Sequence, residues 1–257
     1  PIGHRCLMKY GGDLLYLNVQ GLYPLSKAMQ SSQVNPEVAL TDNISRAFTE
    51  ATFAHKSKDG WDITFFPQGN QVLVNVPVRS GSEQEQYVMN TITNSWWRFT
   101  GIESNCWAIS NEKLYFGGNG NVGHFGEVYA DNTEDIVTNL KQAFSYLGSK
   151  GRVKKINSLR PVLLANGTPA VSVAISVDFG DEYGVSALTF SPNPQGTWDS
   201  ATWNSGIWGG SVSHFYDWQT VSGVGTAVSL RMTTVSNGLD LRHASTDYVY
   251  ENGGVIV

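Results

Sequence analysis

Short apolar runs alternate with turn residues through the first half of the chain. Four of these runs form two pairs, at 14–18 with 22–25 and at 114–117 with 121–125. Gln20 and Gly21 separate the first pair, Asn119 and Gly120 separate the second, and such turn residues between apolar runs indicate a β-hairpin. Both pairs share a frame of Leu-Tyr followed by a glycine-containing turn. We therefore predict a repeated β unit, which is typical of blade or array architectures.

Further strands are expected between these hairpins, at short and even spacing, over 61–66, 71–78, 86–90 and 96–99. One segment, 41–51, departs from the β pattern. Its apolar residues recur at the i, i+3, i+4, i+7 spacing of one helix face: Ile44, Ala47, Phe48 and Ala51. Thr41 or Asp42 stands at the capping position. We predict a short helix inserted between blades.

The apolar pattern changes after the acidic, polar stretch at 131–135. The expected strands are now longer, and 170–177 alternates strictly between apolar and small residues. The others are expected at 136–140 and onward to 148, and at 159–164, 215–221, 227–234 and 247–250. Gly-rich or Asn-Gly turns separate them, which favours an antiparallel sandwich. The predicted fold is all-β: a partial β-propeller with a short inserted helix over 1–130, then an antiparallel β-sandwich over 131–257.

A different pattern interrupts this second half at 196–210, GTWDSATWNSGIWGG. It places three rings at intervals of five, a spacing that fits neither a strand nor a helix: Trp198, Trp203 and Trp208. We predict a structured loop whose rings pack within their own domain, contact a neighbouring subunit or stack on a sugar, and all three readings stay open. Asp199 can fix the turn beside Trp198 by accepting backbone N–H groups. Trp218 is a further contact candidate, and Trp208, between glycines, is expected to be the most exposed of the loop.

Composition narrows the function classes. Hydrophobic residues make up 41% of the chain, enough for a core, and 27 glycines favour a turn-rich β protein. The net charge of −5 gives DNA or an anionic membrane no reason to adhere, and no apolar run approaches the ~18 residues of a membrane span. Cys6 and Cys106 form no disulfide framework, so we expect free buried thiols. Because the chain opens at Pro1, one strand pair short of a blade, we expect that Pro1 is not the native start.

No set of residues stands out as catalytic or metal-binding. The sequence has no GxSxG or phosphate-loop motif and no closely spaced histidine pair. Asp62 and Glu103 could be proposed as the two carboxylates of a glycosidase, but nothing in their spacing selects them over the other acidic residues. The remaining charged groups are expected in solvated turns or on an exposed strand face, rather than on Ca²⁺ or phosphate: Asp178, Asp181 and Glu182, and the basic cluster Lys150, Arg152, Lys154 and Lys155. We therefore predict no enzyme activity, no metal and no cofactor.

Several stretches resemble one family of viral proteins. They are 86–101 (QYVMNTITNSWWRFTG), Cys106, 114–122, 197–199 with Trp203 and Trp208, Trp218 with 221–225, and 250–254. Together they are similar to the tail-hub proteins of short-tailed phages, the nozzle and packaged-DNA stabilisation proteins, over residues 10–257. The resemblance implies a homo-hexameric ring at the DNA exit channel, with portal-adaptor or other tail proteins as partners. It also implies a virion location, after assembly in the host cytoplasm, and no catalytic residues. Too few blades are present for a closed propeller, so the N-terminal blades are expected on a separate fragment or another chain.

These observations favour a structural virion protein that retains or guides packaged DNA. A weakly charged, acidic channel would let DNA slide without sequence-specific binding, since binding requires Lys and Arg to displace counterions. The alternative is a carbohydrate-binding module of a phage tail or secreted protein, because tryptophan rings stack on sugars. A hydrolase built on a propeller is the third and least favoured hypothesis.

Overall fold

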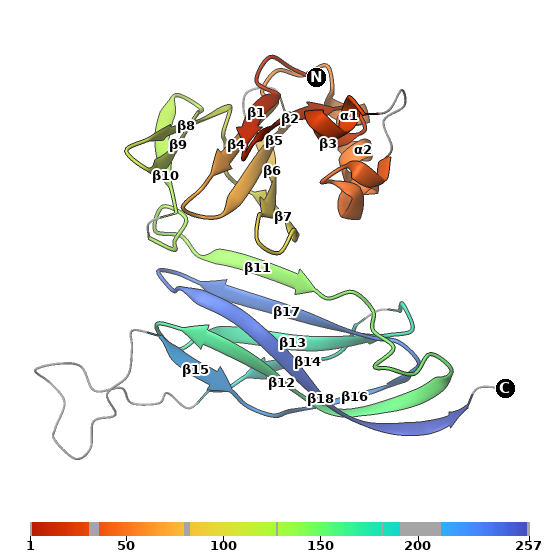
Figure 1. Cartoon of the computed structure of the whole chain (residues 1–257). Coiled ribbons are helices and arrows are strands. Elements are labelled where there is room, and N and C mark those ends of the chain that lie inside the picture. Colours follow the sequence, from red (N-terminus) through yellow and green to blue (C-terminus); the bar gives the residue numbers. More distant parts are fainter. Residues whose placement is uncertain are drawn as a thin grey trace, which may run out of the picture. The chain divides into compact units, whose positions relative to one another are not determined.

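Strands dominate the computed structural model, which describes residues 2–30, 36–79, 83–126, 128–180, 182–190 and 212–255. The chain divides into two compact units, an N-terminal unit (Pro1–Glu127) and a C-terminal unit (Val128–Val257), where the sequence placed the division after residue 130. The prediction of an all-β protein is confirmed (Figure 1).

Within the described residues, the N-terminal unit contains three antiparallel sheets, each made of strands that follow one another along the chain. The first sheet is β1 (Leu7–Tyr10), β2 (Asp13–Asn18) and β3 (Gly21–Pro24). The second is β4 (Asp62–Phe66), β5 (Gln71–Arg79), β6 (Glu83–Asn90) and β7 (Trp96–Thr100). The third is β8 (Cys106–Ser110), β9 (Lys113–Gly118) and β10 (Asn121–Phe125). Four of the hairpin turns hold an asparagine with positive φ, a conformation that asparagine tolerates: Asn70, Asn94, Asn111 and Asn119.

The helical segments lie between β3 and β4: α1 (Leu25–Ala28), η1 (Pro36–Val38), η2 (Asp42–Ile44) and α2 (Ser45–His55). The predicted helix over 41–51 is present, but it begins with a 3₁₀ turn and continues to His55. Phe48 is fully buried as expected, whereas Ala47 is exposed. The expected cap is wrong, because the Thr41 hydroxyl does not cap the helix but accepts the N–H of Leu22 at 3.2 Å.

The second sheet of the N-terminal unit is buried on both faces. Val72 and Val74 of β5 point into a cluster shared with the first sheet and α2, which includes Leu15, Leu17, Leu22 and Phe48. Leu73, on the opposite face, joins a smaller cluster with the third sheet that contains Val88, Trp107 and Leu114. Because side chains alternate along a strand, one strand supplies both clusters. The middle sheet therefore packs between its two neighbours.

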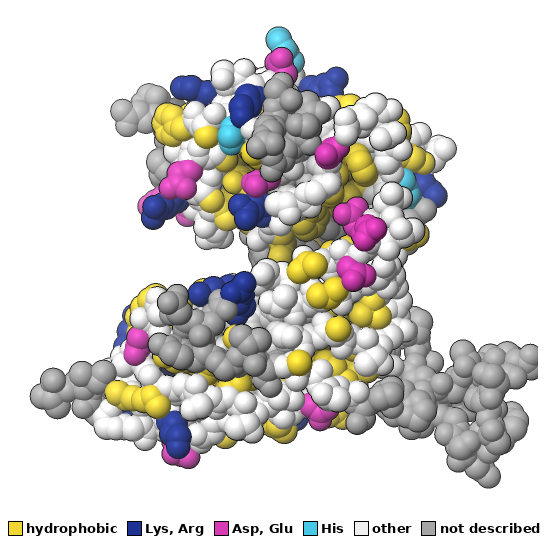
Figure 2. Space-filling model, turned by 180° about the vertical axis from the view of Figure 1, so that it is seen from behind, with side chains coloured by type: hydrophobic (Ala, Val, Ile, Leu, Met, Phe, Trp, Pro, Cys, Tyr) yellow, Lys and Arg dark blue, Asp and Glu magenta, His cyan; other side chains and the backbone are white. Residues whose placement is uncertain are grey.

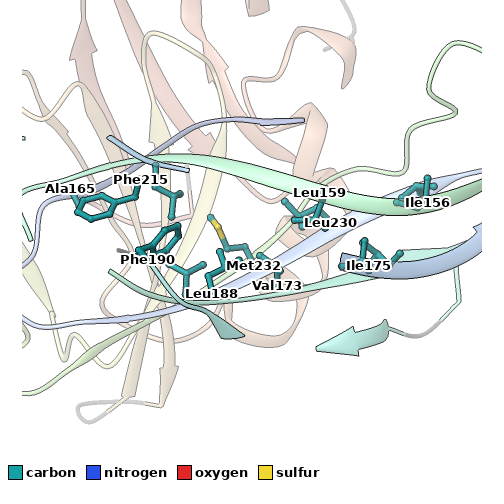
Figure 3. Packing of buried hydrophobic residues seen from close by; sticks show 14 residues of the cluster. Ile156, Leu159, Ala165, Val173, Ile175, Leu188, Phe190, Phe215, Leu230 and Met232 are labelled. Atoms are coloured by element: carbon teal, nitrogen blue, oxygen red, sulfur yellow. The ribbon is translucent and has the colours of Figure 1, made fainter. Parts of the chain in front are cut away.

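The described part of the C-terminal unit contains two sheets. One has the order β11 (Ile136–Lys141), β17 (Val228–Ser236), β13 (Ala170–Val177) and β14 (Glu182–Leu188). In the other, β12 (Arg152–Ala165) pairs with β15 (Ser213–Tyr216) and β16 (Gln219–Gly225) along one edge and with β18 (Leu241–Val255) along the other. Both sheets contribute to one apolar cluster. Figure 3 shows Phe190 and Phe215 near one end of this cluster and Ile156 and Ile175 near the other.

Several strand boundaries differ from the sequence prediction. The strand expected from 136 toward 148 ends at Lys141, because the chain then meets β17 only through separate backbone bonds and turns at Leu147 and Gly148, which both have positive φ. The strand expected at 215–221 is two strands, interrupted at Asp217 and Trp218. β12 and β18 are longer than predicted, and β1, β8 and β14 were not predicted.

Candidate functional site

Of the five predicted contact residues, only one lies in the part of the chain that the structure describes. Trp198, Asp199, Trp203 and Trp208 lie outside the described residues. Trp218 is described, lies between β15 and β16, and is 47% exposed. It is therefore the residue around which a candidate site can be built.

Trp218 belongs to a cluster of aromatic and charged side chains. The guanidinium of Arg160 lies over the Trp218 ring, 4.8 Å from its centroid, and 5.8 Å from the centroid of the Tyr216 ring. The Arg160 Nε and Nη2 groups both donate to Asp247 Oδ2, at 3.0 and 2.7 Å. We call Arg160, Tyr216, Trp218 and Asp247 the aromatic–ionic cluster.

Strand alternation and register bring this cluster together. Leu159 and Leu163 of β12 are fully buried, so Arg160 between them points to the outer face of the sheet. Phe215 is buried, so the next residue of β15, Tyr216, also points outward. In register, Arg160 stands opposite Asp247 of β18, and Tyr216 stands opposite Val162 of β12.

The aromatic–ionic cluster adds little to the stability of the fold, and its main effect is to orient the two rings. Its ion pair is partly exposed, with 34% of the Arg160 side chain and 44% of the Asp247 side chain accessible, and such pairs contribute about 0–1 kcal/mol. A guanidinium held at two nitrogens is a fixed plane, and the ring stacked on it is held with it. Among the described residues, none accepts a hydrogen bond from the Trp218 indole N–H or the Tyr216 hydroxyl.

A second arrangement, in the N-terminal unit, joins the first strands of successive sheets. Arg5 forms a parallel bridge with Asp62 at the start of β4, and the N–H of Ile63 donates to the Arg5 carbonyl at 3.1 Å. On the other side, Asp62 Oδ2 accepts the N–H of Trp107 in β8 at 3.1 Å. Asp62 is only 5% exposed, and burial raises the pKa of its carboxyl while the Trp107 N–H lowers it in part. β4 is therefore bonded to the chain of both neighbouring sheets.

Two buried amide side chains add further bonds to the connection between the β4 sheet and the β8 sheet. Asn75 Nδ2 donates to the carbonyls of Gly60 and Ser104 at 2.8 and 2.6 Å. Gln86 Nε2 donates to Asn75 Oδ1 at 2.9 Å and to the Ile102 carbonyl at 3.0 Å. Asn75 and Gln86 are fully buried, where a polar group is costly unless it is bonded. These bonds fix the segment that leads into β8, and amides supply no acid or base.

The predicted carboxylate candidates have structural bonds rather than a shared site. Asp62 bonds backbone as described, and Glu103 Oε2 accepts from Asn119 Nδ2 at 2.7 Å. Asp178 Oδ1 accepts from the Thr226 hydroxyl and N–H and from the Ala227 N–H, at 2.7, 2.8 and 3.0 Å, and these bonds hold the pKa of its carboxyl below the usual range. Asp181 and the side chain of Glu182 lie outside the described residues.

The predicted exposed basic cluster is wrong at one position. Lys150, Arg152 and Lys155 are exposed, but Lys154 is fully buried. Its Nζ donates to the carbonyls of Ser149, Arg152 and Thr226. The outward positions of β12 cannot include Lys154, because it precedes buried Ile156 by two residues and so shares its face. That alternation is the sequence signal that indicates an inward position for Lys154, and the prediction did not use it.

The cysteines are free, but they differ in burial. Cys6 is fully buried, and burial raises the pKa of its thiol, whereas Cys106 is only partly buried, so the prediction of two buried thiols is wrong for Cys106. No group of three His, Cys, Asp or Glu side chains within the described ranges is arranged to hold a metal ion. In the same part of the chain, no helix has the length and apolar character needed to cross a membrane.

Sequence reasoning missed Arg160, Tyr216 and Asp247. Arg160 and Asp247 are 87 positions apart, and only the pairing of β12 with β18 brings them together. No local motif marks any of the three. Comparison with known proteins does not mark them either, because no family model matches this chain and no curated protein matches it.

Proposed function

We propose that this chain is a structural virion protein of a phage tail, a hub or nozzle component that forms a ring at the DNA exit channel and acts without catalysis. The observation that carries the proposal is the arrangement of the N-terminal unit, where the first strands of three successive sheets lie side by side. β1 contacts β4 and β4 contacts β8, through the bonds of Arg5, Asp62 and Trp107. The resemblance of the sequence to tail-hub proteins supplies the biological setting.

The side-by-side first strands support a partial β-propeller. A propeller repeats small antiparallel sheets radially around a channel, so that each blade packs its faces on its neighbours. The middle sheet, β4–β7, has both faces covered in this way, by the clusters around Val74 and Leu73. For the C-terminal unit, two antiparallel sheets around one shared apolar cluster support a β-sandwich.

The exposed end faces of the first and third sheets are evidence for further blades beside them. Propellers typically close with about 4–8 blades, so three sheets leave two end faces to be covered. Leu7 on the outward face of β1 is 51% exposed, and Val122 on the outward face of β10 is 80% exposed. We propose that other copies of the chain, or a fragment that carries the N-terminal blades, cover these faces.

The charge distribution suits a channel that DNA passes without adhering. The chain carries a net charge of −5. On the face shown in Figure 2, Lys and Arg side chains occur in small separate groups rather than as one continuous basic surface. Tight DNA binding requires many Lys and Arg contacts that release counterions. A surface of this kind would guide packaged DNA and keep it mobile.

The test is the assembly state of the purified chain, measured by mass photometry and by negative-stain electron microscopy. We expect ring-shaped particles with the mass of six copies. Val122→Asp, which places a charge on an end face, is expected to lower the ring fraction. Ile92→Asp is the matched control, because Ile92 is 73% exposed but lies in the turn after β6. A chain that stays monomeric up to its solubility limit contradicts the proposal.

A further inference from the structure

We propose that the aromatic–ionic cluster on the outer face of the β12 sheet binds a neutral saccharide, with Trp218 and Tyr216 as stacking platforms and Arg160 and Asp247 as hydrogen-bonding groups. This site is additional to the proposed structural role, and it is independent of whether the chain forms a ring. Its argument uses only described residues, so it does not depend on the tryptophan loop at 196–210.

The size of the exposed aromatic surface favours a small ligand. Trp218 is 47% exposed and Tyr216 is 58% exposed. Because a large aromatic side chain offers about 150–250 Å², the two rings together present on the order of 200 Å². A standard protein interface needs roughly 800 Å² from each partner. The rings therefore match a few sugar units better than a protein partner.

The rings are already held in position before a ligand arrives. Arg160 lies against both rings, and Asp247 fixes the guanidinium through Nε and Nη2 at 3.0 and 2.7 Å. Binding to a pre-ordered platform avoids the entropy cost of immobilising side chains. Arg160 and Asp247 thus act first as positioning residues for the aromatic platform.

The chemistry of the cluster matches the two kinds of surface on a pyranose. The C–H face of the sugar packs on an aromatic ring, and its hydroxyl groups need both donors and acceptors around that ring. The cluster supplies donors in the Trp218 N–H, the Tyr216 hydroxyl and the guanidinium, and acceptors in the Asp247 carboxylate. Few ligand classes other than carbohydrates combine an apolar ring face with a rim of hydroxyl groups.

The charges of this face favour an uncharged ligand. Arg160 is paired with Asp247, and on the same face Lys155 of β12 stands opposite Glu251 of β18. Each cation named here has an anion beside it, so an anionic sugar would gain little attraction and would meet a carboxylate. A neutral sugar has no net charge for the Asp247 carboxylate to repel. On an open sheet face we expect weak binding, with a dissociation constant of about 0.1–1 mM for an oligosaccharide.

The experiment is a glycan array with neutral and acidic oligosaccharides, probed with the full chain. Isothermal titration calorimetry then follows, with the neutral oligosaccharide that gives the strongest signal. We expect Trp218→Ala and Tyr216→Ala each to weaken binding by about tenfold or more, since each ring presents on the order of 100 Å² of surface for the C–H face of the sugar to cover. Trp97→Ala is the matched control, because Trp97 is a 42% exposed tryptophan of the N-terminal unit. It is expected to leave binding unchanged.

A conservative variant separates positioning from charge. Arg160→Lys keeps the positive charge but loses the flat plane, so we expect weaker sugar binding with an unchanged melting temperature. Thermal melts of all variants establish that the proteins are folded, as expected for substitutions at exposed positions. The proposal is overturned if no neutral glycan binds, if only acidic glycans bind, or if Trp218→Ala retains full affinity. Ring assembly without sugar binding overturns this inference alone, and sugar binding by a monomer overturns only the proposed assembly.

Discussion

The two units use the same kind of antiparallel strand but connect their strands over different distances along the chain. In the N-terminal unit, the strands of each described sheet follow one another in sequence, from β1-β2-β3 to β8-β9-β10. In the C-terminal unit, β11 pairs with β17 and β12 pairs with β18. Local pairing makes each sheet a module, whereas distant pairing makes the C-terminal unit fold as a whole, at a higher cost in loop closure.

The units also differ in what fixes one sheet against another. Between the sheets of the N-terminal unit, two apolar clusters are accompanied by bonds between buried polar side chains and backbone, at Asp62, Asn75 and Gln86. Between the sheets of the C-terminal unit lies one apolar cluster that includes Leu163 and Leu230, and Asp178 bonds the chain between β16 and β17. Hydrogen bonds specify a geometry, and apolar packing supplies stability in proportion to buried area. The buried amide bonds are therefore what distinguishes the N-terminal unit, and they favour one geometry between successive sheets.

The largest expected effect comes from opening the C-terminal core. Leu230→Ala removes a fully buried side chain of β17 and is expected to cost about 2–5 kcal/mol. We expect calorimetry to show two transitions, of which only that of the C-terminal unit moves. Leu73→Ala, the same change at a fully buried position of β5, should move the other transition. A single transition that shifts for both variants would contradict the independence of the units.

A smaller effect is expected from Lys154, the buried cation of the C-terminal unit. Lys154→Met keeps the length of the side chain but leaves the Ser149, Arg152 and Thr226 carbonyls without this donor. We expect a loss of about 2–3 kcal/mol in the free energy of unfolding, measured by urea titration. Lys155→Met, at the exposed neighbouring position, should stay within about 0.5 kcal/mol of the parent protein. Equal effects of the two substitutions would mean that Lys154 does not hold these carbonyls together.

The smallest effect is a pair of opposite pH dependences, one in each unit. The pKa of Asp62 is raised, so the folded protein keeps this proton where the unfolded chain has lost it. The stability that results is fully present below the usual aspartate pKa of 3.8 and is lost as the pH rises through the raised value. Asp62→Asn, which stays neutral, should therefore stabilise the N-terminal unit near pH 7, with a gain that shrinks toward low pH.

Asp178 provides the matched comparison, because its pKa is lowered by its bonds to Thr226 and Ala227. Its contribution is present above the usual aspartate pKa and is lost as the pH falls through the lowered value. Asp178→Asn should therefore destabilise the C-terminal unit at neutral pH and have less effect in acid. Thermal melts of both variants across the acidic range would test the pair. The same sign of effect at neutral pH for both variants would show that one assignment is incorrect.

Local signals explain which parts of the fold were predictable. The β2–β3 and β9–β10 hairpins were found because Gly or Asn-Gly marks their turns and the paired strands are neighbours in sequence. β12 and β18 were underestimated because charged residues such as Lys155 and Glu251 lie on their outer face and interrupt the apolar pattern. The 3₁₀ turn before α2 was missed because Thr41 bonds to β3 rather than to the helix.

The candidate site was predictable only in part. Trp218 was singled out as a contact candidate together with the loop tryptophans and through the resemblance, and it is 47% exposed. Its partners depend on the register of β12 with β15 and β18, which a single sequence does not reveal. The burial of Lys154, by contrast, was visible in the sequence. Its alternation with Ile156 indicated an inward position, but the charge of the side chain was given more weight.

The burial of Lys154 also makes this residue a chemical reporter. Amine-reactive acylating reagents modify a lysine only when they can reach its nitrogen, and Lys150 and Lys155 on either side are exposed. The two exposed amines would be labelled at once, whereas Lys154 would be labelled only when β12 separates from the turn at Thr226. One short stretch of chain, 150–155, would then carry both the signal and its internal standard. Mass spectrometry of that stretch would time the opening of the C-terminal unit within the full chain.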